Sequence, residues 1–86
     1  AIKWYKLAAE QGYAYAQTAL GQMYENGHGV IQDYTRAYMW FIIAASSWDP
    51  DARKKQDIVA KQMNSTQLEE AQRLASECMK KNYKSC

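Results

Sequence analysis

The segment AYMWFIIAA at residues 37–45 repeats the segment AIKWYKLAA at residues 1–9, with an offset of 36 residues. Five positions match without a gap, and the matched pairs are Ala1 with Ala37, Trp4 with Trp40, Tyr5 with Phe41, Ala8 with Ala44, and Ala9 with Ala45. Their spacing of i, i+3, i+4, i+7 and i+8 describes one face of an α-helix. Because periods of 20 to 50 residues are typical of solenoid proteins, the repeat predicts helices stacked in a row.

Between the two copies, the sequence predicts another amphipathic helix at residues 14–25. Its apolar residues recur at helical spacing and are Ala16, Ala19, Leu20, Met23 and Tyr24. Gly21 lies in the middle of this helix, where glycine costs about 1 kcal/mol relative to alanine. We therefore expect a neighbouring helix to approach Gly21 closely, over a position such as Ala8 or Ala44. Gly27 suits the left-handed position that follows the end of the helix.

The whole chain is predicted to form five helices, at residues 1–11, 14–25, 33–46, 50–63 and 65–82. Asp33 is a suitable N-cap for the third helix. Asp49 and Pro50 are typical of the N-cap and first residue of the fourth. Asn64 and Gln67 have the spacing of a capping box at the start of the fifth. These local signals predict an all-α fold.

Residues 1–48 resemble the Sel-one-like repeat family, which is related to the tetratricopeptide repeat. The resemblance lies in a first helix like AYAQTALGQMYENG, a loop like HGVIQDY and a second helix like AYMWFIIAA. It implies an α/α solenoid of antiparallel helical hairpins. Two departures are Ile31, where the family often has proline, and Ser46-Ser47-Trp48 in place of the usual EQG ending. The second departure suggests that the array of repeats stops here.

The chain divides into three parts on this interpretation. Residues 1–12 are the second helix of an incomplete repeat, 13–48 form one complete repeat, and 49–86 form a C-terminal helical cap with a polar outer face. We expect the chain to be the C-terminal part of a longer array. Ile2 and Trp4 should then not both be fully buried, and the first helix could support self-association through its exposed apolar surface.

Composition argues against several classes of partner. Eleven basic and nine acidic residues give a net charge of +2, which is too balanced to indicate nucleic-acid binding. No apolar run approaches the roughly 20 residues of a membrane span. His28 stands alone in a loop and lacks the partners of a metal ligand or catalytic base. The sequence therefore predicts no catalytic residue, no metal site and no cofactor.

Cys78 and Cys86 are the only cysteines. If the last helix ends near Asn82, the tail can fold back and the two can form a disulfide. If the helix continues to the end, the two residues lie about 12 Å apart, which is too far for a bond. A disulfide would favour a periplasmic or secreted setting, and free thiols would favour the cytoplasm.

The remaining candidate site is a surface of the helix at 14–25. The face away from the predicted core carries Tyr15, Thr18, Gln22 and Glu25, which could bind an extended peptide or another protein. The leading hypothesis is a non-catalytic protein–protein interaction module, and the family resemblance implies adaptor roles in bacterial signalling, envelope function or host contact. One alternative is the β-lactam binding or hydrolysis linked to cysteine-rich relatives, although residues 1–48 contain no cysteine. Another is a purely structural cap.

Overall fold

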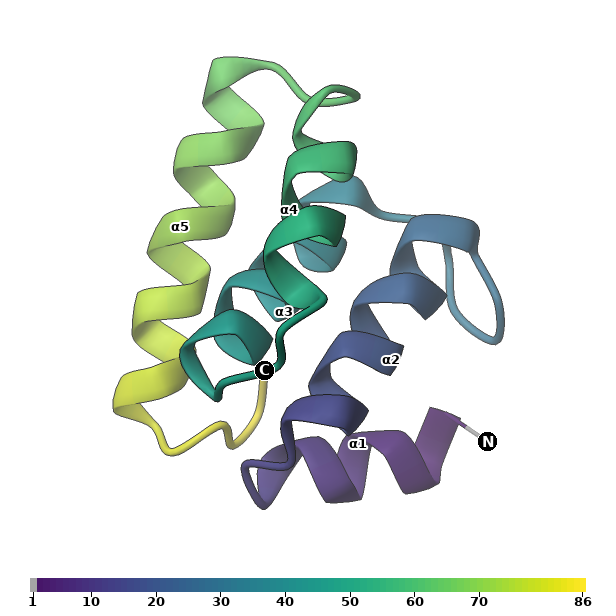
Figure 1. The fold of residues 1–86 in the computed structure, drawn as a ribbon, viewed down its shortest axis with the longest axis vertical. Helices are drawn as coiled ribbons and strands as arrows, with labels where there is room; N and C mark the ends of the chain where they lie inside the picture. Colours follow the sequence, from purple (N-terminus) through teal and green to yellow (C-terminus); the bar gives the residue numbers. More distant parts are fainter. Residues whose placement is uncertain (1) are drawn as a thin grey trace.

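The computed structural model describes residues 2–86 as five α-helices joined by short loops (Figure 1). They are α1 (Ile2–Glu10), α2 (Ala14–Asn26), α3 (Tyr34–Ser46), α4 (Ala52–Ala60) and α5 (Ser65–Lys80). No β-strand occurs in this part of the chain. The predicted all-α helical repeat fold is therefore confirmed.

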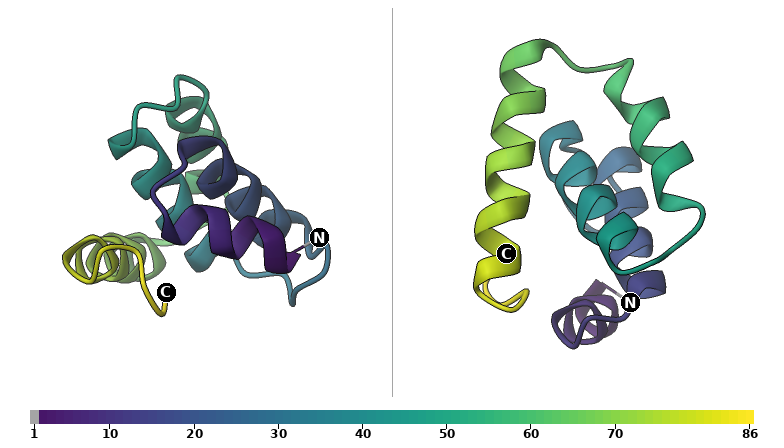
Figure 2. Two further views of the ribbon diagram at one scale, coloured as in Figure 1. Left: turned by 90° about the horizontal axis from the view of Figure 1, so that it is seen from below. Right: turned by 60° about the vertical axis from the view of Figure 1, so that its left-hand side comes forward.

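The central helix of the fold is α3, because α2, α4 and α5 all pack against it. The helices α1 and α2 also form a packed pair. The last two helices lie on different sides of α3, as the right-hand view of Figure 2 shows. The two helices of segment 49–86 therefore pack on different sides of α3 and do not form a closely packed hairpin with each other.

Burial on almost all sides explains the unusually apolar sequence of α3. Its buried residues are Ala37, Tyr38, Met39, Trp40, Phe41, Ile43 and Ala44. Trp40 belongs to a cluster that includes Leu20 of α2 and Ala75 of α5. Phe41 belongs to a second cluster with Val59 of α4. One helix thus joins the repeat to the two helices that follow it.

Gly21 permits the close approach of α2 and α3. A Cβ atom at this position would lie 2.4 Å from Cε1 of Phe41, which is far inside van der Waals contact. The predicted close neighbour is therefore present, but the expected alanine position, Ala8 or Ala44, was wrong. An aromatic ring can lie directly against the α2 backbone because glycine has no side chain.

Most helix ends follow the predicted capping residues. The side chain of Asp33 accepts a hydrogen bond from the backbone N–H of Arg36, at 3.2 Å. Asn64 and Gln67 form both hydrogen bonds of a capping box. Gly27 ends α2 with a φ of 71°. These predictions are confirmed. They could be made from the sequence because each cap depends on residues that lie close together in the chain.

The fourth helix is shorter than the predicted range of 50–63. Asp49 is not its N-cap, since its Oδ1 accepts a hydrogen bond from the N–H of Asp51 at 3.0 Å and holds the chain in a turn. At the other end, the N–H of Met63 donates to the carbonyl of Ala60 at 3.1 Å, which tightens the chain into a turn. The extended backbone of Asn64 then begins α5.

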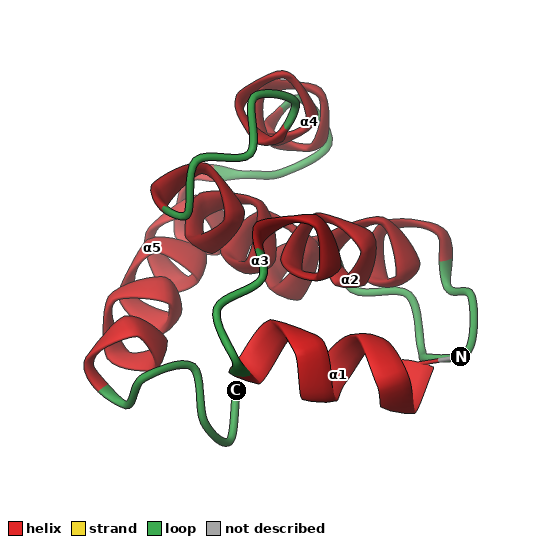
Figure 3. Cartoon of the chain, turned by 60° about the horizontal axis from the view of Figure 1, so that its bottom comes forward, coloured by secondary structure: helices red, strands yellow, loops and turns green. Residues whose placement is uncertain are grey.

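The last helix ends at Lys80 rather than at residue 82. Asn82, Tyr83 and Ser85 have positive φ values of 55°, 66° and 58°. These conformations turn the chain back, so that the C-terminal segment runs from α5 toward α1 (Figure 3).

Candidate protein-binding surface

A groove runs between α2 and the connection from α3 to α4. Its volume is about 350 Å³, and its lining residues are Tyr15, Thr18, Ala19, Gln22, Asp49, Pro50, Asp51 and Lys55. The helix contributes one wall because Tyr15, Thr18 and Gln22 are three or four residues apart and share a face. The other wall is the turn at 49–51. We call this hollow the α2 groove.

Three of the four residues predicted to form a binding face line the α2 groove. Tyr15 is 73% exposed, and Gln22 is exposed nearer the middle of the helix. Glu25 is half-buried one turn further on and does not line the groove. The exposed side chains available to a partner are therefore Tyr15 and Gln22.

Thr18 was expected to face solvent, and that expectation was wrong. Only 5% of its surface is exposed. The reason is that Asp49 folds over α2, and the Thr18 hydroxyl donates a hydrogen bond to the Asp49 carboxylate. The two residues are 31 positions apart, so no local pattern in the sequence indicated this contact. Thr18 thus fixes the wall of the groove and is not freely available at its surface.

An apolar hollow adjoins the α2 groove and shares Tyr15 with it. Its volume is about 460 Å³, and its lining residues are Trp4, Tyr5, Ala8, Tyr13, Tyr15 and Ala16. Trp4 and Tyr13 are 74% and 65% exposed, and Ile2 is half-buried. The expectation that α1 presents an apolar surface is therefore confirmed. Together, the two hollows give a surface that is aromatic at one end and polar at the other.

Gln17 fixes the junction of α1 and α2 beneath this surface. Its side chain is fully buried, and its Nε2 donates a hydrogen bond to the carbonyl of Ala9 at 3.1 Å. That carbonyl lies in the last turn of α1, where helix carbonyls lack partners within the helix. The sequence analysis missed this residue, because a glutamine between apolar positions resembles an ordinary surface residue.

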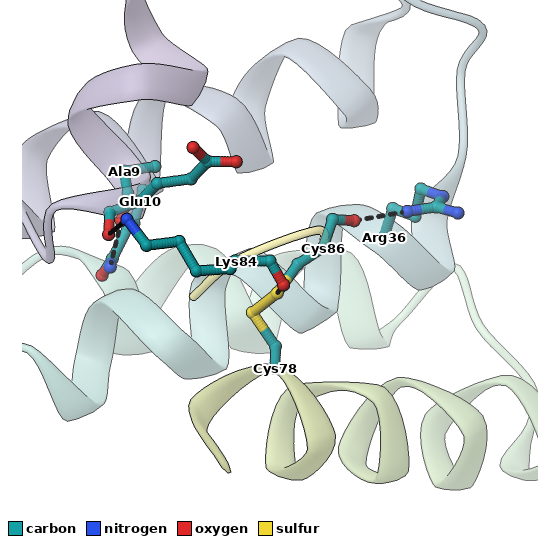
Figure 4. The surroundings of a disulfide bond; sticks show 7 residues. Ala9, Glu10, Arg36, Cys78, Lys84 and Cys86 are labelled. Carbon is teal, nitrogen blue, oxygen red and sulfur yellow. Dashed lines mark hydrogen bonds between the residues drawn. A yellow bond between two sulfur atoms is a disulfide. The ribbon is translucent and has the colours of Figure 1, made fainter. Parts of the chain in front are cut away.

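The C-terminal segment crosses from α5 toward α3 and α1 (Figure 4). A disulfide joins Cys78 to Cys86, with a Cα–Cα distance of 5.7 Å. Arg36 on α3 donates to the backbone carbonyl of Cys86 at 2.8 Å. Lys84 Nζ donates to the carbonyl of Glu10 on α1 at 3.4 Å. The segment thus links α5 to both α3 and α1.

No three His, Cys, Asp or Glu side chains of residues 2–86 lie together in a group that could hold a metal ion. The pKa of Arg73 is raised by hydrogen bonds to Glu70 and Glu77 and by their charges, but this cluster lies on the exposed face of α5. None of the five helices is both long and apolar enough to cross a membrane.

Comparison with solved structures supports the fold. The crystal structure of c5321, described as a protective antigen present in uropathogenic Escherichia coli strains and displaying an SLR fold, matches with a TM-score of 0.88. The two chains are 30% identical over this match. It covers 95% of this chain and 19% of the E. coli protein.

Comparison with other sequences identifies a curated relative and a family. A protein of Schizosaccharomyces pombe (strain 972 / ATCC 24843), named chitin synthase regulatory factor 3, is 44% identical over 55 residues. Those residues are 64% of this chain and 6% of the yeast protein. The model of the Sel1 repeat family matches residues 1–13 and 14–47, which is more than half of the chain. The chain therefore belongs to the Sel1 repeat family.

Proposed function

We propose that this chain is a non-catalytic module that binds a segment of another protein along the α2 groove and the adjoining apolar hollow. The observation that carries the proposal is that Tyr15 lies in both hollows and joins them into one surface. Aromatic side chains dominate the energetics of many protein interfaces, and this surface exposes three of them near one another. A yeast relative that is named as a regulatory factor supports a scaffolding or regulatory role.

The chemistry of the surface suits an extended segment. The apolar hollow could take an aliphatic or aromatic anchor against Trp4, Tyr13 and Tyr15. The amide of Gln22 could donate to and accept from a peptide backbone that lies along the groove. The part-buried Thr18–Asp49 hydrogen bond and the buried Gln17–Ala9 hydrogen bond hold the groove in shape before a partner arrives, which lowers the cost of ordering it on binding.

We also propose that residues 13–48 act as one repeat and 49–86 as its cap, and that the apolar face of α1 can receive a helix when no peptide segment fills the apolar hollow. The support for a helix on this face is the internal repeat. Trp40 is the equivalent of Trp4 in the next repeat, and it is covered so that only 2% of its surface is exposed.

In a concentrated solution a second copy of the chain could cover the apolar face of α1. Sedimentation equilibrium should show weak association of the chain, and Trp4→Glu should shift it to the monomer. Equal association of the original chain and the Trp4→Glu variant would argue against this role of the face.

The groove can be tested with a phage-displayed library of random 12-residue peptides, selected against the immobilised chain. Selected peptides would be synthesised and their Kd measured by fluorescence anisotropy. We expect Tyr15→Ala combined with Gln22→Ala to raise Kd about tenfold or more, since interface hot spots contribute at least about 1–2 kcal/mol each. The midpoint of thermal unfolding should hardly change because both side chains are exposed.

Gln72→Ala provides a matched control, because Gln72 is an exposed glutamine on α5, outside the groove. It should leave Kd unchanged. If every selected peptide binds the Tyr15/Gln22 double variant as well as it binds the original chain, the proposed groove is wrong. The alternative of a purely structural cap would then be favoured.

A further inference from the structure

The apolar hollow beside the α2 groove is formed mainly by aromatic side chains. Four of its six lining residues are aromatic, and they are Trp4 and Tyr5 of α1, Tyr13 between α1 and α2, and Tyr15 of α2. None of the six is charged, and only carbon atoms form the surface of the hollow. A polar anchor would lose its hydrogen bonds to water there and would find no hydrogen-bonding partner. The chemistry of the hollow therefore selects an apolar anchor.

The hollow is also open. Trp4, Tyr13 and Tyr15 are all largely exposed, so their rings form broad walls that remain in contact with solvent. A long side chain gains most from a closed pocket that removes all of its surface from water. A compact ring needs only a shallow hollow to place one face against aromatic side chains. The exposure of the walls therefore favours a short, rigid anchor over a long, flexible one.

The carbon surface limits the backbone that can lie over it. A peptide N–H pressed against the hollow would lose its hydrogen bond to water, which is costly when nothing replaces that bond. Proline has no N–H and so avoids this cost. Proline-rich segments also hold the extended polyproline II conformation before they bind, which lowers the entropic cost of ordering them on an open surface. Both effects favour proline over other apolar residues.

We propose that the apolar hollow binds the proline residues of an extended segment in the polyproline II conformation. This inference rests on the proposed function, because it names the part of the partner that lies in the hollow. Grooves lined by aromatic side chains are a recurring docking site for such segments. Because Tyr15 joins the hollow to the α2 groove, the rest of the segment can reach Gln22. The Gln22 amide can then donate to backbone carbonyls that polyproline II leaves unpaired.

A fluorescein-labelled peptide of ten prolines is the probe, and a labelled peptide of the same length with alternating alanine and serine is the control. We expect fluorescence anisotropy to give a Kd for the proline peptide at least about tenfold lower than for the control. Proline should also be enriched among the peptides selected from the random library. The unlabelled proline peptide should compete with those peptides, because both occupy the hollow.

Trp4→Ala and Tyr13→Ala test the hollow separately from the groove, since both residues line the hollow only. Each should raise the Kd of the proline peptide about tenfold. Tyr13→Phe should leave Kd unchanged, because the ring carbons and not the hydroxyl face the hollow. Ile31→Ala is the control for loss of an exposed apolar side chain, because Ile31 is largely exposed and lies outside the hollow.

Two results would overturn the inference and leave the proposed function intact, provided that the library peptides still require Tyr15 and Gln22. One is equal binding of the proline peptide and the alternating peptide. The other is a Kd for the proline peptide that neither Trp4→Ala nor Tyr13→Ala changes.

Two further outcomes have separate meanings. If a second copy of the chain is the occupant, sedimentation equilibrium will show association that the proline peptide does not reverse, and the inference fails. Library peptides that bind independently of Tyr15 and Gln22 would instead overturn the proposed function and, with it, this inference.

Discussion

Trp4 and Trp40 occupy equivalent positions 36 residues apart, but the structure buries only Trp40. Trp40 is enclosed by a cluster that draws residues from α1, α2, α3 and α5. Trp4 remains 74% exposed, because no helix among residues 2–86 covers its side of α1 in the same way. At the scale of a residue, the same side chain can therefore be part of the core in one repeat and part of a surface in the next.

This difference predicts unequal effects of the same substitution. Trp40→Ala should lower the free energy of unfolding by about 3–5 kcal/mol, because it leaves a large cavity in the core. Trp4→Ala should lower it by less than about 1 kcal/mol. Urea unfolding followed by far-UV circular dichroism would measure both. Similar losses in the two variants would contradict the burial of Trp40 and the exposure of Trp4.

Gly21 gives a second prediction at this scale. Alanine is favoured over glycine in a helix by about 1 kcal/mol, but a Cβ here would collide with the buried ring of Phe41. We expect Gly21→Ala to destabilise the chain by about 1–3 kcal/mol, since overpacking outweighs helix propensity. The same urea experiment measures the loss.

A double variant tests the cause of that loss. Combining Gly21→Ala with Phe41→Leu should cost less than the sum of the two single changes, because the ring that collides is gone. Gln22→Ala, on the exposed side of the same helix, should be close to neutral. Strict additivity of the two core changes would contradict the close contact.

At the scale of the element, the capping residues define most helix ends, and α4 shows where they are insufficient. This helix has nine residues, and isolated helices of that length are marginal in water. Its ends are therefore set by its contacts with α3 and by the turns that flank it. By contrast, α5 has 16 residues and a complete capping box, so its start could be predicted from four consecutive residues.

The capping box of α5 gives a prediction for this scale. Asn64→Ala removes the side chain that accepts a hydrogen bond from the N–H of Gln67 at 2.8 Å. We expect a loss of about 1 kcal/mol in the free energy of unfolding. Ser65→Ala, at the neighbouring position and also exposed, should change it by less than half as much. An equal effect of the two substitutions would show that the cap contributes nothing specific.

At the scale of the whole molecule, the C-terminal segment connects helices that the order of the chain keeps apart. The hydrogen bond from Lys84 to Glu10 spans 74 positions, and the one from Arg36 to Cys86 spans 50. Tyr83 lies close to Gly12, at the end of α1. The disulfide returns this segment toward α3 and α1, and so helps to set the position of α5 relative to the repeat.

Loss of the disulfide should therefore weaken the whole fold. For a short loop such as that from Cys78 to Cys86, chain entropy predicts a loss of about 2.5 kcal/mol. In a chain of this size, that corresponds to a fall of roughly 10–20 °C in the midpoint of thermal unfolding. Thermal unfolding of Cys86→Ser, and of the unmodified chain with and without reductant, would measure it.

The variant Cys78→Ala/Cys86→Ala is the control for the reductant. Reductant should not change its thermal unfolding, because it has no disulfide to lose. Mass spectrometry with and without reductant would show directly whether the two cysteines are paired. If the midpoint of thermal unfolding of the unmodified chain is the same with and without reductant, the stabilising role of the disulfide is contradicted.

The sequence by itself determined that the chain forms five helices and that Asp33 and Asn64 cap two of them, because periodicity and capping act between residues about two helical turns apart or less. It also indicated the face of α2 that carries Tyr15 and Gln22. Only the tertiary structure decided that Asp49 buries Thr18 and that Phe41 is the neighbour of Gly21. The physical reason is that these outcomes depend on contacts between distant segments, whose relative positions are fixed only when the helices pack.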